Sequence, residues 1–167
     1  MADNAAYIAA VLSAILVHEA GHIIALALFG VKPERGKPGF WGIGIGADFT
    51  ALSYPAQAAV SAAGSAVNFL CLCVFAPNTE FGAASLAYGA FNLLPLGMLD
   101  GGEILKSVLL AAGVADSAVY RILSVSGKVC TAALWMLAVY LSLRGNTAIL
   151  LISVIYMVFM CFFRKSY

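Results

Sequence analysis

The sequence predicts an all-α polytopic membrane protein, with about five transmembrane helices and a small membrane-associated β-hairpin after the first. Of its 167 residues, 63% are hydrophobic and 10% are charged, whereas a soluble domain is about half apolar and a quarter charged. The net charge is +1, and no basic cluster indicates nucleic-acid binding. This length leaves no room for a separate soluble domain, so residues 1–167 are expected to form one membrane unit.

Five apolar stretches approach the length of about 20 residues that a helix needs to cross a bilayer. They are residues 5–29, 55–76, 83–113, 117–142 and 147–163. The first is too long for a cleavable signal and lacks a basic segment before it. The third is interrupted at residues 92–100, and the last is near the short limit. Lys128 fits poorly inside the fourth stretch, where it must snorkel or face a polar interior.

The basic residues predict the orientation of the chain, because Lys and Arg concentrate in cytoplasmic loops. With the N-terminus outside, only Arg144 falls in an outside loop. The cytoplasmic side then receives Lys32, Arg35, Lys37, Arg164 and Lys165. We therefore expect a multi-pass protein of the cell membrane, with its N-terminus outside and its C-terminus inside.

The segment after the first stretch has the alternation of a β-strand. Residues 40–47 read Phe-Trp-Gly-Ile-Gly-Ile-Gly-Ala, and a return through residues 49–54 would complete a hairpin. A glycine face lets another backbone approach, and an edge strand can hold an unwound peptide by strand addition. Gly42, Ile43 and Gly44 are therefore candidate substrate-binding residues. The alternative is a loop at the membrane interface.

The chain has two histidines, His18 and His22, and together with Glu19 they form the pattern H-E-x-x-H. Residues four apart on a helix share a face, so both imidazoles can bind one metal ion. A carboxylate beside the metal can accept a proton from water, which makes Glu19 a candidate catalytic base. An ionisable group is costly in so apolar a run unless it has a function.

A catalytic zinc ion takes three protein ligands and one water, so this pattern lacks one ligand. Because there is no third histidine, a carboxylate or a thiolate must supply it. Asp100 follows Pro95, which breaks a helix, and stands among glycines that permit irregular backbone. Irregular backbone at membrane depth is tolerated only against protein or a water-filled cavity. Asp100 is therefore the favoured third ligand of one zinc ion per chain, and a turn or cap residue is the alternative.

These motifs together resemble those of the site-2 protease family of intramembrane zinc metalloproteases. The resemblance rests on the H-E-x-x-H at residues 18–22, on Asn-Leu-Leu-Pro at 92–95 and on Asp-Gly-Gly at 100–102. Gly64 followed by Asn68 matches a further motif, although Ser65 stands where many members have proline.

The resemblance covers a core of about residues 5–113, and residues 117–163 would form accessory helices. Unlike larger members, residues 1–167 are expected to contain neither a PDZ-like nor a nucleotide-sensing domain. It therefore looks like the compact branch that includes the sporulation-factor processing proteases.

The resemblance implies a zinc metalloendopeptidase, in which His18, His22 and Asp100 bind Zn²⁺ and Glu19 is the catalytic base. It would cleave a transmembrane segment of a single-span, membrane-tethered protein in regulated intramembrane proteolysis. The membrane would be a bacterial cell membrane, with the active site opening toward the cytoplasm.

Two questions stay open on the sequence alone. Asn68 or Asn92 would hold the substrate or the oxyanion, and a structural hydrogen bond between helices is the alternative for Asn68. The rival function is a membrane metal-ion transporter that uses the same His and Asp ligands. A transporter has no need of Glu19 beside His18, and no second set of polar ligands follows along the chain.

Overall fold

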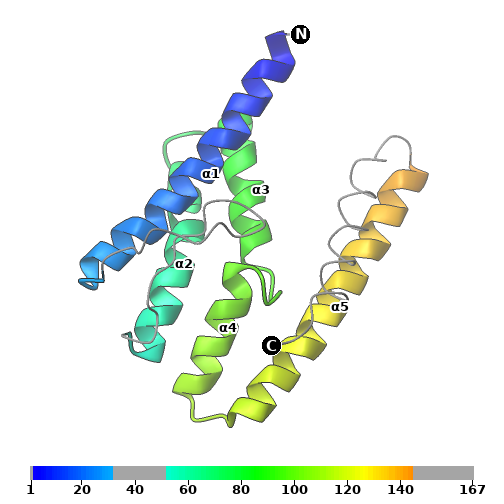
Figure 1. Cartoon of the computed structure of the whole chain (residues 1–167). Coiled ribbons are helices and arrows are strands. Elements are labelled where there is room, and N and C mark those ends of the chain that lie inside the picture. The colour runs from blue at the N-terminus through cyan, green and yellow to red at the C-terminus, as the bar shows by residue number, and fades with distance from the viewer. Residues whose placement is uncertain (1, 32–51, 145–167) are drawn as a thin grey trace.

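The computed structural model describes residues 2–31 and 52–144, which contain five α-helices and no strand (Figure 1). The helices are α1 (Ala2–Leu28), α2 (Tyr54–Cys71), α3 (Glu80–Asn92), α4 (Asp100–Ala111) and α5 (Asp116–Leu143). Helix α1 packs against α2 and α3, and α2 also contacts α3 and α4. Helix α5 packs on α4 and stands beside the group formed by the first four helices (Figure 1).

The prediction of about five transmembrane helices is wrong. In the part of the chain that the structure describes, two helices are long and apolar enough to cross a membrane, Asn4–Leu28 and Asp116–Leu141. The stretch 83–113 is divided into α3 and α4, which have 13 and 12 residues. At about 1.5 Å per residue each reaches about 20 Å or less, short of the roughly 30 Å hydrocarbon core.

Helix α2 is also not among the helices that are long and apolar enough to cross a membrane, for a different reason. Its 18 residues come near to spanning length, but its buried face includes polar side chains. These are Gln57, Ser61, Ser65 and Asn68. These polar residues leave α2 less apolar than α1 and α5, so it is long enough but not apolar enough to cross a membrane by the same test. The fifth predicted stretch, 147–163, lies outside the described residues.

The predicted β-hairpin is absent from the described residues, and the fold there is all-α without it. Most of the hairpin, residues 40–51, lies outside them. Tyr54, expected to close the returning strand, begins α2 instead. Pro55 stands in the first turn of that helix, where its missing N–H and fixed φ are compatible with helical structure.

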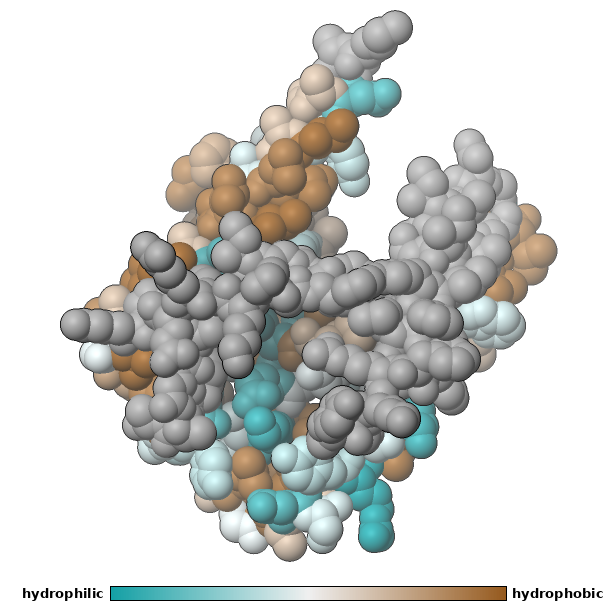
Figure 2. All heavy atoms as spheres, in the orientation of Figure 1, coloured by the Kyte–Doolittle hydropathy of each residue, from teal (hydrophilic) through white to brown (hydrophobic). Residues whose placement is uncertain are grey.

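The two helices that can cross a membrane carry most of their large apolar side chains on the outside. On α1 these include Ile8, Leu12 and Leu16, all more than half exposed, and apolar residues run along this helix in Figure 2. On α5 they include Val129 and Met136. Only 28% and 11% of the two apolar windows are buried, whereas the core helix of a soluble protein is mostly buried.

The break between α3 and α4 falls at residues 92–100, as predicted, and it positions Asp100 as the first residue of α4. The connecting turn is anchored by Leu96, which is buried. The N-terminus of α4 sits so tightly on this turn that a Cβ atom at Gly101 would collide with the carbonyl groups of Leu93 and Leu94. Because glycine has no side chain, Gly101 allows α4 to start beside the end of α3.

Candidate metal centre

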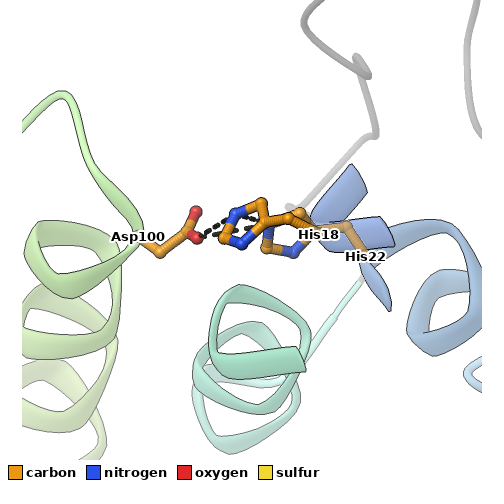
Figure 3. A group of neighbouring side chains, drawn as sticks. All are labelled: His18, His22 and Asp100. Carbon is orange, nitrogen blue, oxygen red and sulfur yellow. Dashed lines mark hydrogen bonds and ion pairs between the residues drawn. The ribbon is translucent and has the colours of Figure 1, made fainter. Parts of the chain in front are cut away.

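His18, His22 and Asp100 converge on one point from two helices (Figure 3). The two histidines extend from α1, one turn apart, and Asp100 reaches them from the start of α4. Oδ2 of Asp100 lies 2.9 Å from Nε2 of His18 and 3.3 Å from Nε2 of His22. The two Nε2 atoms are 3.1 Å apart. The structure thus brings together the three residues that the sequence predicts as ligands.

The spacing of these three atoms fits a metal ion. In a tetrahedral zinc site with bonds of about 2.0–2.1 Å, neighbouring ligand atoms are about 3.3 Å apart. The distances between the Nε2 and Oδ2 atoms are 2.9, 3.1 and 3.3 Å. Oδ2 of Asp100 is buried, yet no hydrogen bond of proper geometry reaches it within the described part of the chain. Two imidazoles and a carboxylate form a donor set that zinc accepts.

His22 is held in one orientation by the backbone of α2. Its Nδ1 lies 2.8 Å from the carbonyl oxygen of Val60. A carbonyl only accepts hydrogen bonds, so Nδ1 carries the proton and donates it, which leaves Nε2 free to bind a metal. Metal-binding histidines are commonly oriented in this way through their other ring nitrogen. The sequence pattern did not reveal this contact, because the pattern concerns side chains.

Gly64 forms the wall of α2 that faces the two imidazoles. A Cβ atom at this position would collide with Nε2 of His22 and lie 2.7 Å from Nε2 of His18. Gly21 has the same role on α1, since a Cβ there would lie 2.7 Å from the carbonyl oxygen of Ala63. The two glycines let α1 and α2 approach closely, which seats the histidines against α2.

Glu19 follows His18 on α1 and is partly exposed. Its carboxylate interacts electrostatically with His22 and with Tyr88. It therefore stands beside the three ligand residues without belonging to them, which suits a base that serves a metal-activated water.

The two predicted asparagines take different positions. Asn68 is fully buried, and both polar atoms of its amide lack a hydrogen-bond partner among the described residues. It packs against Gly89 of α3. Asn92 donates a hydrogen bond of 3.1 Å to the backbone oxygen of Tyr88. Neither belongs to the ligand group of His18, His22 and Asp100. The remaining candidates, Gly42, Ile43 and Gly44, lie outside the described residues.

Tyr88 is a neighbour of the centre that sequence reasoning missed. Its ring meets the ring of His18 edge to face, with centroids 4.9 Å apart and planes at 83°. The signal that points to it is its spacing, because Tyr88 precedes Asn92 by four residues and therefore shares a helix face with it.

Comparisons with protein-family profiles, with curated proteins and with solved structures found no match. The resemblance to the site-2 proteases therefore rests on the motif residues alone.

Replacing Asp100 by asparagine is expected to weaken zinc binding by about ten-fold or more, since losses of that size follow even from changes beyond the ligands. The neutral amide oxygen is a poorer ligand than a carboxylate. A competition titration with a chromophoric chelator measures the affinity. Glu103→Gln is the matched control, because Glu103 lies one turn further along α4 and pairs with Lys106 at 2.9 Å. Wild-type affinity in Asp100→Asn would return Asp100 to the role of a helix-start residue.

Proposed function

We propose that this chain is a zinc-dependent intramembrane endopeptidase that cleaves a transmembrane segment of a membrane-tethered protein. The observation that carries the proposal is the convergence of His18, His22 and Asp100 within 2.9–3.3 Å of one another. Two of these ligands, and Glu19, lie on a helix that is apolar enough to cross a membrane. A hydrolytic site on such a helix is suited to substrates that are themselves in the bilayer.

Each residue of the centre has a distinct task in peptide hydrolysis. His18, His22 and Asp100 would hold a zinc ion, which would supply a bound water with a pKa lowered toward about 7 and a Lewis acid for the carbonyl group. The Glu19 carboxylate accepts the proton of the attacking water and delivers it to the nitrogen of the leaving amine. Val60 keeps the His22 proton on Nδ1, so that Nε2 stays available to the metal.

Water must reach this site, and two features support a route from one side. The side chains of His22 and Asp100 are 14% and 22% exposed, so the centre is not sealed. A cavity of about 710 Å³ runs along α4 and between the beginnings of α2 and α5. Its lining includes Glu103 and Lys106, which lie about one and two helical turns beyond Asp100. The ligand residues do not line this cavity, and Glu103, three residues beyond Asp100, is the lining residue nearest to them along α4. We propose that water approaches the centre from this side.

The proposed setting is a bacterial cell membrane that α1 and α5 both cross. Helix α1 then runs from the outside to the cytoplasm, in keeping with the basic residues that follow it. The metal-binding residues lie 6 to 10 residues before Leu28, which corresponds to a depth of about 9–15 Å along the helix. The cavity beside α4 opens on the same side, so the active site faces the cytoplasm.

The proposed substrate is a single-span membrane protein whose cleavage releases a regulatory segment. This partner class follows from the likeness to the compact, sporulation-protease-like branch of the site-2 protease family. The other partner is the lipid bilayer, and nucleic acid is not among the partners.

A metal-ion transporter is the second candidate, because it would use the same three ligands. A transport path needs successive binding sites, and among the described residues His18, His22 and Asp100 form the one group able to hold a metal. Glu19 beside them serves hydrolysis and has no task in transport. We therefore favour the protease.

Glu19→Gln tests the proposal. We expect this variant to keep one zinc ion per chain and to lose cleavage by at least about 100-fold, since a positioned base contributes about 10²–10⁴-fold. Membrane proteomics of cells with the wild-type and variant proteins should show single-span proteins that accumulate with the variant. Each is then tested as a purified substrate in proteoliposomes, with Glu80→Gln as the control, because Glu80 is exposed at the start of α3. Undiminished cleavage by Glu19→Gln would refute the protease mechanism, and zinc uptake by sealed proteoliposomes would favour the transporter.

A further inference from the structure

Tyr88 stands beside the metal centre on a helix that supplies no ligand. Helix α3 packs against α1, and this contact places the Tyr88 ring edge to face with the His18 ring, with centroids 4.9 Å apart. The side chain is half-buried. A tyrosine that only filled space here would need no polar atom, so the position of its hydroxyl group matters.

The phenol lies at the edge of the centre, because its ring contacts the ring of a ligand residue, His18. Asn92 donates a hydrogen bond of 3.1 Å to the backbone oxygen of Tyr88, so it braces the residue from the next turn of α3. The phenol also interacts with the Asn92 side chain and, through charge, with the carboxylates of Glu19 and Asp100. The Tyr88 side chain is therefore a neighbour of both the base and the third ligand.

Among His18, His22, Asp100 and Glu19, no group is assigned to stabilise the negative charge that develops on the substrate during hydrolysis. During hydrolysis the carbonyl oxygen of the scissile bond gains negative charge, which hydrogen-bond donors stabilise. In a metal-loaded site the Nε2 lone pairs of His18 and His22 would be bound to the metal, and the carboxylates of Asp100 and Glu19 are acceptors, so none of these groups donates a hydrogen bond. A phenol with an ordinary pKa of about 10 is protonated at neutral pH and is a donor.

We propose that Tyr88 is a catalytic residue whose hydroxyl group donates a hydrogen bond to the scissile carbonyl oxygen as that oxygen becomes negative. In this step the water oxygen bonds to the carbonyl carbon, the C–N bond breaks, and Glu19 carries the water proton to the amine. Tyr88 keeps its own proton throughout. Asn92 is a positioning residue that orients the phenol. This inference rests on the proposed peptidase function.

Tyr88→Phe tests the inference, because it keeps the ring against His18 and removes only the hydroxyl. With a substrate from the proteomic comparison, kcat should fall by about 100-fold, as when one oxyanion donor is lost. The KM and the zinc affinity should not change. Tyr7→Phe is the matched control, since Tyr7 lies near the start of α1, eleven residues before His18, and is 59% exposed.

A second measurement does not depend on turnover. A peptidyl phosphonamidate carries negative charge on a tetrahedral centre, and its binding to the Co²⁺-substituted protein is followed by visible absorption. We expect Tyr88→Phe to bind it about 100-fold more weakly, in step with the loss of kcat. The corresponding uncleaved peptide should bind the variant and the wild-type protein equally.

The outcomes separate the two proposals. If Glu19→Gln is inactive and Tyr88→Phe retains wild-type kcat and phosphonamidate affinity, the peptidase stands and the role of Tyr88 is overturned. Loss of zinc affinity in Tyr88→Phe would also overturn it, by showing that the hydroxyl supports the His18 site. If Glu19→Gln retains full activity, the peptidase proposal fails and the role of Tyr88 fails with it.

Discussion

Replacing Gly64 by alanine is expected to lower zinc affinity by about 100-fold, the upper end of the range for disturbed ligand surroundings, while the chain stays folded. The new Cβ would collide with Nε2 of His22 and come within 2.7 Å of Nε2 of His18. Both rings can move aside, so the fold survives, but the atoms that must move are the Nε2 atoms of the proposed metal ligands. Alanine is also the better helix former by about 1 kcal/mol, which offsets part of the strain.

This expectation is checked by chelator competition for zinc and by thermal unfolding of the metal-free protein in detergent. Gly127→Ala is the matched control, because a Cβ at Gly127 in α5 would meet its nearest atom at 3.9 Å. Unchanged zinc affinity in Gly64→Ala would show that the two imidazoles can move away from the new Cβ atom and still bind the metal. A large loss of metal-free stability would instead assign Gly64 to helix packing.

Replacing Gly101 by alanine is expected to lower the stability of the metal-free protein, whereas Gly64→Ala mainly lowers zinc affinity. Its Cβ would collide with the carbonyl groups of Leu93 and Leu94. Backbone atoms cannot turn aside as a side chain does, so α4 has to shift away from the end of α3. Overpacking of this kind costs about 3 kcal/mol. Because Asp100 begins α4, zinc affinity should fall together with stability.

Unfolding of the metal-free variant measures this loss. Gly97→Ala is its control, since Gly97 lies in the same break and a Cβ there would meet no atom within 4 Å. Equal stability of Gly101→Ala and Gly97→Ala would mean that the turn between α3 and α4 yields easily. In that case the position of Asp100 would not depend on the glycine.

The ligand group could be predicted because each member follows from a local rule. The spacing of His18 and His22 requires only a helix, and Pro95 marks the break that frees Asp100 from a continuous helix. Tyr88 was not predictable in this way. Its contact with His18 depends on how α3 lies against α1.

The number of membrane-crossing helices could not be predicted either. Apolar composition over residues 83–113 gave no measure of how much the break shortens each helix, and α3 and α4 proved shorter than a bilayer. In α2, polar residues such as Gln57 and Asn68 share the buried face. These residues make α2 less apolar than α1 and α5, and it is therefore not among the helices apolar enough to cross a membrane.

The hydrogen bond from His22 to Val60 has a consequence for how this protein can change by mutation. Its acceptor is a carbonyl oxygen within α2, and all twenty amino acids have that group. Residue 60 can therefore vary in side chain without removing the contact that selects the metal-binding nitrogen of His22. Substitutions can replace the ligand residues or fill the space around them. The tautomer of His22 does not depend on them, because it is set by a backbone carbonyl group of α2. A change of side chain at residue 60 therefore does not remove the hydrogen bond that orients His22.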